Sequence, residues 1–179
     1  MKLTAIDVSK NKEARKKTKA LYLSAFPKEE LVPWWIMRFI SMRRGIQITA
    51  YYDGDRFCGF THSVELEDFY FVTFFAVDAS HRGCGYGSAI LSLLKERGKP
   101  IALNVEPLTD DAPNPEERKN RLAFYYKNGF FDTDYDVKEI GGVFRILSTK
   151  QALNVKSYKK VFRKMSFGLW NVKVMPIKK

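Results

Sequence analysis

The sequence predicts an α/β fold in which helices flank a mixed central sheet, with a helical extension at the C-terminal end. An unbroken apolar run over 69–77, rich in aromatic and β-branched residues, is typical of a buried central strand. After a glycine-rich turn, Ile90, Leu91 and Leu94 recur at helical spacing, and Gly98 marks the end of that helix. A second apolar run over 101–105 follows, so the two strands should be parallel.

The other elements follow from alternation, helical spacing and turn residues. Ser9 is the expected N-cap of the first helix, Gly45 the stop of the second, and Gly59 the site of a β-bulge. Asp53-Gly54-Asp55 predicts a hairpin turn. Strands are expected over 3–8, 46–52, 56–65, 131–137 and 143–148, and helices over 10–25, 28 or 33 to 44, 115–128 and 155–167, with a turn around Gly141-Gly142.

The turn that follows the central strand has the composition of an anion-binding site. Glycine lets backbone N–H groups approach a ligand closely, and the first turn of a helix leaves N–H donors at the positive end of its dipole. A ligand-free turn is the alternative, but three alternating glycines beside an arginine favour phosphate. The residues expected to bind it are Arg82, Gly83, Cys84, Gly85, Tyr86, Gly87 and Ser88.

Two common phosphate motifs do not fit this turn. A Walker A loop needs a lysine after its glycines, and a dinucleotide fingerprint needs a third glycine where Ser88 stands. The pattern Arg82-x-x-Gly85-x-Gly87 instead resembles the acyl-CoA-binding motif of the GCN5-related N-acetyltransferase (GNAT) superfamily. In that superfamily the turn holds the pyrophosphate of coenzyme A. Ala79 stands where many members carry proline.

The resemblance implies a fold and a co-substrate. In this superfamily the strands corresponding to 69–77 and 101–105 splay apart, and the pantetheine arm of acetyl-CoA inserts between them. A backbone N–H of the central strand polarises the thioester carbonyl, and here Phe75, Ala76 and Val77 occupy that place.

A second motif, Phe124-Tyr125-Tyr126-Lys127-Asn128-Gly129-Phe130, resembles the F-Y-x-K-x-G-F signature of the same superfamily. The resemblance makes Tyr125 the residue that protonates the departing thiolate. Helical spacing alone does not choose between Tyr125 and Tyr126, because both are neighbours of Leu122. Many members carry Asn and Ala where this chain has Arg118 and Arg121.

The amine acceptor must also lose a proton, and a carboxylate is the usual base. Glu106, at the end of the 101–105 strand, is the first candidate, and a simple loop carboxylate is the alternative. Glu65 and Glu67, before the central strand, and His62 are the other titratable candidates. No His, Cys, Asp or Glu spacing suggests a metal site.

Composition and charge limit the domain organisation, the cellular compartment and the partners that the sequence allows. The 179 residues should form one acyltransferase domain over 1–148, with a basic extension over 149–179 packed on it. Cys58 and Cys84 show neither a disulfide pattern nor a metal-ligand pattern, and the N-terminal residues contain no apolar signal core. No apolar stretch reaches 18 residues. We therefore expect a cytoplasmic protein with no membrane span. The formal charge is +11, and +9 of it lies in residues 150–179. A solvated basic face is favoured over a nucleic-acid surface.

The expected activity is therefore transfer of acetyl from acetyl-CoA to an amine by direct attack. The superfamily acetylates small amines, antibiotics, polyamines, peptides, protein lysines and N-termini, so the acceptor is a small molecule or a peptide. The alternative is a non-catalytic acyl-CoA-binding module that holds a partner with its basic tail. The sequence leaves a homodimer open.

Overall fold

The computed structural model describes residues 2–109, 114–139 and 142–177. Its chain divides into two compact units: the first is Met1–Leu66 with Val72–Gly98, and the second is Glu67–Phe71 with Lys99–Lys179. The expected turn at Gly141 and the last two lysines of the basic extension lie outside the described residues.

The first unit contains four strands and the helices between them. In chain order its elements are β1 (Leu3–Asp7), α1 (Lys12–Ala25), the 3-10 turn η1 (Lys28–Glu30), α2 (Trp34–Ile40), β2 (Ile46–Asp53), β3 (Arg56–Glu65), β4 (Tyr70–Val77), the 3-10 turn η2 (Ala79–His81) and α3 (Tyr86–Lys95). β4 begins in the second unit and continues in the first. β1 pairs with β2, and β2 with β3, in antiparallel register.

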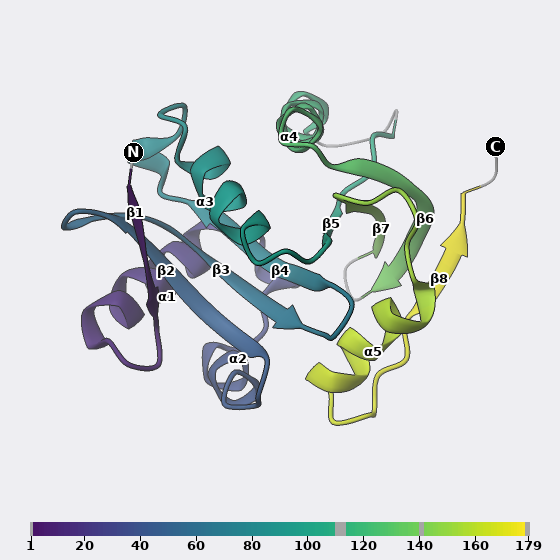
Figure 1. The fold of residues 1–179 in the computed structure, drawn as a ribbon, viewed down its shortest axis with the longest axis horizontal. Helices are drawn as coiled ribbons and strands as arrows, with labels where there is room; N and C mark the ends of the chain where they lie inside the picture. The colour runs from purple at the N-terminus through teal and green to yellow at the C-terminus, as the bar shows by residue number, and fades with distance from the viewer. Residues whose placement is uncertain (1, 110–113, 140–141, 178–179) are drawn as a thin grey trace. The chain divides into compact units, whose positions relative to one another are not determined.

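The second unit contains the remaining strands and helices. Its elements are β5 (Ile101–Val105), α4 (Pro115–Lys127), β6 (Phe131–Glu139), β7 (Gly142–Ser148), α5 (Val155–Met165) and β8 (Lys173–Pro176). The hydrogen-bonded strand order is β1-β2-β3-β4-β5-β7-β6-β8 (Figure 1). The predicted class, a mixed α/β fold with flanking helices and a C-terminal helix, is confirmed.

Local details correct three of the predictions. The N-cap of α1 is Asn11 and not Ser9, because the Asn11 side chain accepts from the Ala14 N–H at 2.9 Å. α2 ends at Ile40, four residues before Arg44, and the Ser41 hydroxyl donates to the Met37 carbonyl at 2.6 Å at its end. β8 was not predicted; it pairs with β6.

The bulge between β2 and β3 is confirmed, and it has a steric reason. Tyr51 pairs with Gly59 and Tyr52 with Phe57, so Cys58 is the extra residue. A Cβ on Gly59 would lie 2.4 Å from the backbone oxygen of Ala76. Glycine is therefore needed at this position for β3 to approach β4.

The core of the first unit lies between α1, α2 and strands β2 to β4. It is unusually aromatic, and the ring of Tyr22 meets Phe60 and Phe74 edge-on with centroids 6.2 and 5.1 Å apart. The Tyr22 hydroxyl donates to the Val32 carbonyl at 2.9 Å and accepts from the Val32 N–H at 2.8 Å, which fixes the loop before α2.

The C-terminal extension contributes α5 to the core of the second unit. Tyr158, Val161 and Phe162 are buried, whereas Lys160 and Arg163 are exposed. Tyr158 stacks edge-on against Phe71, with centroids 5.4 Å apart, and the Tyr158 hydroxyl donates to Asn104 at 2.9 Å. Within the ranges described, no helix has the length and apolar character needed to span a bilayer.

Candidate functional site

The glycine-rich turn forms a compact backbone cradle in front of α3. Gly83 and Gly85 have φ of 79° and 85°, in the left-handed region, and a Cβ on either would meet no atom within 4 Å. The constraint on these glycines is therefore the backbone conformation and not the space around them. Gly87 differs, because it lies inside the first turn of α3.

The start of α3 offers backbone N–H donors, and no side chain caps them. Gly85 is the N-cap and has no side chain that could accept from the N–H groups of the first turn, and that turn contains no acidic residue. The first intrahelical bond runs from the Ala89 N–H to the Gly85 carbonyl at 3.0 Å. The N–H groups of Tyr86, Gly87 and Ser88 precede that bond, so they are directed out of the helix end toward an anion.

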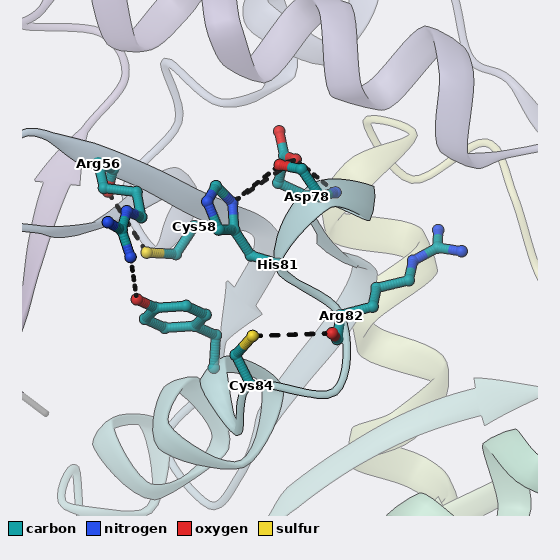
Figure 2. Close-up of polar contacts among 8 residues, drawn as sticks. Arg56, Cys58, Asp78, His81, Arg82 and Cys84 are labelled. Atoms are coloured by element: carbon teal, nitrogen blue, oxygen red, sulfur yellow. Dashed lines mark hydrogen bonds and ion pairs between the residues drawn. The ribbon is translucent and has the colours of Figure 1, made fainter.

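The cradle carries a cation at its entrance. Arg82 is exposed, and Figure 2 shows its guanidinium pointing away from Asp78 and His81. Asp78 instead caps η2, accepting from the Ser80 hydroxyl at 2.5 Å and the Ser80 N–H at 3.0 Å. These hydrogen bonds, the hydroxyl's first, lower the pKa of Asp78, which therefore stays ionised and holds the turn that leads to Arg82.

Contacts with the β2–β3 hairpin anchor the cradle. Tyr86, in the first turn of α3, is buried, and its hydroxyl donates to Asp53 at 2.9 Å. The Arg56 guanidinium donates to the same hydroxyl at 3.4 Å (Figure 2). No sequence pattern pointed to this contact, because 33 residues separate Asp53 from Tyr86. Tyr86, whose N–H is expected to bind the ligand, thus contacts the hairpin through its hydroxyl.

The two cysteines are free thiols in different settings. Cys84 is exposed in the cradle, whereas Cys58 is buried on β3. Burial raises the pKa of Cys58, so this thiol is protonated at neutral pH. The described residues contain no group of three or more His, Cys, Asp or Glu side chains suited to a metal ion.

An open groove of about 670 Å³ lies beside the cradle in the first unit. It is formed by α1, the β2–β3 hairpin and η2, and its lining includes the acidic Asp55 and Asp78 as well as Lys17, Arg56 and His81. Acidic and basic side chains therefore share the lining of this groove.

Residues of β4 direct their backbone polar groups alternately toward β3 and away from it. The Ala76 carbonyl is directed at Gly59 of β3, and the Asp78 N–H donates to the Cys58 carbonyl of the same strand at 2.9 Å. Because successive residues of a strand direct their polar groups to opposite sides, the N–H of Val77 points away from β3.

In the second unit, the two tyrosines of the second motif have different environments. Tyr125, on α4, is buried with an exposed fraction of 8%, and its ring meets Phe130 edge-on with centroids 5.5 Å apart. Burial raises its pKa to about 12, although Arg121 lowers it in part. Tyr126 is 45% exposed, and its hydroxyl donates to Asp132 at 2.7 Å.

Glu106, at the end of β5, is engaged by two arginines of α4. Arg118 donates to one carboxylate oxygen at 2.8 Å and Arg121 to the other at 2.5 Å. Arg118 also donates to the Pro107 carbonyl at 3.1 Å. Arg118 and Arg121, the two departures from the family pattern on α4, therefore share one acidic partner, and that carboxylate is less available as a base than its position in the sequence suggested.

Comparisons with known proteins show that this chain is similar to acetyltransferases. The family model described as an acetyltransferase (GNAT) domain matches residues 44–131, which include the cradle and the second motif. The Bacillus subtilis protein YjbC, named provisionally as an acetyltransferase, is 38% identical over 66 residues, which are 37% of this chain and 33% of that protein. The chain thus matches about a third of the length of this curated relative.

Solved structures share the fold over most of the chain. A provisionally named GNAT-family acetyltransferase from Bacteroides thetaiotaomicron has a TM-score of 0.73 and 25% identity, covering 95% of this chain and 100% of that one. Naa50 from Arabidopsis thaliana, solved with the bisubstrate analogue CoA-Ac-MVNAL, has a TM-score of 0.58 and 17% identity, covering 83% of this chain and 98% of that one.

Proposed function

Because the chain belongs to the GNAT acetyltransferase superfamily, we propose that it transfers the acetyl group of acetyl-CoA directly to an amine acceptor. The observation that carries the proposal is the backbone cradle of Gly83 and Gly85 at the start of α3, directly after β4. The amine of a small molecule or of a peptide is the acceptor.

The cradle fits the pyrophosphate of coenzyme A. Its first-turn N–H groups and the exposed Arg82 offer donors and positive charge, and no carboxylate lies in the first turn of α3 to repel an anion. The N–H of Val77, which points away from β3, supports the role of the 75–77 segment in polarising the thioester carbonyl.

Tyr125 is the proposed proton donor to the thiolate of coenzyme A. A pKa of about 12 keeps its hydroxyl protonated throughout the neutral range. An ordinary thiol has a pKa of about 8.5, below that of Tyr125. Burial raises the pKa of a thiol as it raises that of a phenol, so the pKa of a coenzyme A thiol bound in a buried site lies closer to that of Tyr125. The hydroxyl of Tyr126 already donates its proton in a hydrogen bond to Asp132, which supports Tyr125 as the residue that protonates the thiolate.

Glu106 as the general base stays a prediction, and its contacts suggest a second role. A carboxylate that binds Arg118 and Arg121 ties the end of β5 to α4, the helix that carries Tyr125. We expect Glu106→Gln to loosen this helix and to lower kcat, whether the carboxylate takes the proton or only positions the tyrosine.

Titration calorimetry with acetyl-CoA tests the cradle. We expect micromolar binding by the wild type and at least tenfold weaker binding by Arg82→Ala and by Gly85→Glu, because each loses a charge-assisted contact worth about 1.5–3 kcal/mol or adds a repelling charge. Gly54→Glu is the control: Gly54 has φ of 58° and open space around it, so the substitution adds the same charge at another glycine of positive φ, in the hairpin. Equal weakening by Gly54→Glu and Gly85→Glu would contradict the assignment.

An acceptor panel tests catalysis. Release of free thiol from acetyl-CoA is followed with spermidine, kanamycin, a lysine peptide and the peptide Met-Val-Asn-Ala-Leu, in the wild type and in Tyr125→Phe. Transfer to at least one amine, reduced at least tenfold in Tyr125→Phe at unchanged acetyl-CoA affinity, is the expected result. Binding of acetyl-CoA without transfer to any amine would favour the non-catalytic binding module.

A further inference from the structure

His62 is buried in the first unit between two hydroxyl groups. Its exposed fraction is 1%, and its ring lies on β3 between the end of α2 and β4. Its Nδ1 is 2.5 Å from the Thr73 hydroxyl of β4, and its Nε2 is 3.2 Å from the hydroxyl of Ser41, the residue that follows α2. The ring of Phe74 lies against it, with centroids 6.2 Å apart.

We propose that Thr73, His62 and Ser41 form a proton relay that removes the proton from the acceptor amine during acetyl transfer. The inference rests on the proposed function, because it assigns a further step of the same reaction. It supplies a route for the amine proton that does not require the ion-paired Glu106.

The hydrogen bonds allow the imidazole to hold its proton on either nitrogen. With the proton on Nδ1, the ring donates to Thr73, whose hydroxyl donates to the His62 carbonyl at 3.0 Å, and Nε2 accepts from Ser41. With the proton on Nε2, the ring donates to Ser41, whose hydroxyl donates to the Met37 carbonyl at 2.6 Å, and Nδ1 accepts from Thr73. Each state satisfies both ring nitrogens and both hydroxyl protons.

Passing from the second state to the first transfers one proton through the chain. The Thr73 oxygen receives a proton from the amine while its own proton moves to Nδ1; the Nε2 proton moves to the Ser41 oxygen, and the Ser41 proton leaves to water. The ring stays neutral before and after, and one proton enters and one leaves. Thr73 and Ser41 are both partly exposed, so the two ends of the relay are accessible although the ring is not.

The position of Thr73 suits this role. It lies two residues before Phe75 on β4, about 7 Å along the strand at 3.3 Å per residue. Phe75 is the residue of the proposed carbonyl-polarising segment 75–77 that lies nearest to Thr73, and strand alternation directs its N–H away from β3, as it does that of Val77. Burial lowers the pKa of His62 to about 4, which keeps the ring neutral and prevents it from trapping the proton.

Two substitutions at Thr73 separate the relay from a structural role. Thr73→Val keeps the β-branched shape and removes the hydroxyl, whereas Thr73→Ser keeps the hydroxyl. We expect Thr73→Val to lower kcat at least tenfold, with the best acceptor of the panel and unchanged acetyl-CoA affinity, and Thr73→Ser to stay within about threefold of the wild type. Thr61→Val is the control, because it removes a buried hydroxyl hydrogen bond, to Tyr51 at 3.0 Å, from β3, the strand that carries His62.

His62→Gln tests the imidazole itself. A glutamine can hydrogen-bond but cannot exchange tautomers, so kcat should fall at least tenfold and the solvent deuterium isotope effect on kcat should change. Nitrogen NMR of labelled histidine should show a neutral His62 ring at pH 7.

Several results would overturn the relay. One is a kcat within twofold of the wild type in Thr73→Val or in His62→Gln. Another is an equal loss of kcat in Thr73→Ser and Thr73→Val. The third is an imidazole ring of His62 that is doubly protonated at pH 7. A wild type that fails to bind acetyl-CoA, or that binds it without transfer to any amine, would instead contradict the proposed function, so the two failures are distinguishable.

Discussion

The buried imidazole of His62 should make the protein lose stability as the pH falls below neutral. Burial lowers the pKa of His62 from 6.5 to about 4 in the folded chain. Between these two values the unfolded chain binds a proton that the folded chain does not. Stability is therefore complete above pH 6.5 and decreases as the pH falls toward 4.

The size of the loss follows from the same two values. Each pH unit between them costs about 1.4 kcal/mol, so His62 lowers the free energy of unfolding by about 2 kcal/mol from pH 7 to pH 5 and by about 3 kcal/mol at pH 4. With a urea m-value of about 2 kcal/mol per molar, 2 kcal/mol moves the unfolding midpoint by about 1 M.

Urea unfolding at pH 7 and pH 5, followed by tryptophan fluorescence, measures this shift. His62→Gln should remove most of the difference between the two midpoints. The chain has two histidines, so His81→Gln is the matched control, and it should keep the wild-type difference. Parallel pH profiles for the wild type and His62→Gln would refute the reasoning, because the carboxylates common to both would then account for the whole dependence.

Three stability predictions follow from contacts in the first unit, each measured by urea unfolding at pH 7. Tyr22→Phe should cost about 1–3 kcal/mol, because it leaves the Val32 N–H without its acceptor; no loss would mean that another group replaces the hydroxyl. Gly59→Ala should cost about 1–3 kcal/mol, because its Cβ would lie 2.4 Å from the Ala76 oxygen; a wild-type midpoint would show that β3 and β4 can separate freely. Asn11→Ala should cost about 1 kcal/mol through loss of the α1 cap, and an unchanged midpoint would contradict that cap.

Several parts of the fold could be predicted because they depend on neighbours in sequence. The central strand, the glycine turn and α3 were recognisable from an apolar run, three glycines and helical spacing, all within 30 residues. β3 lies over the predicted residues, because the hairpin turn at Gly54 fixes where it begins. Strand β8 escaped prediction because its four residues alternate weakly and only pairing with β6 defines them.

The sequence by itself determined the family motifs, the position of the cradle and the identity of Tyr125 as the candidate proton donor. Only the tertiary structure showed that Arg118 and Arg121 engage Glu106, and that Ser41 and Thr73 lie on either side of His62. The physical reason is the distance in sequence between the residues that come into contact. Helical and strand periodicity reports contacts between near neighbours, whereas these side chains come from separate elements, and their protonation and hydrogen bonding are decided by the groups that folding places around them.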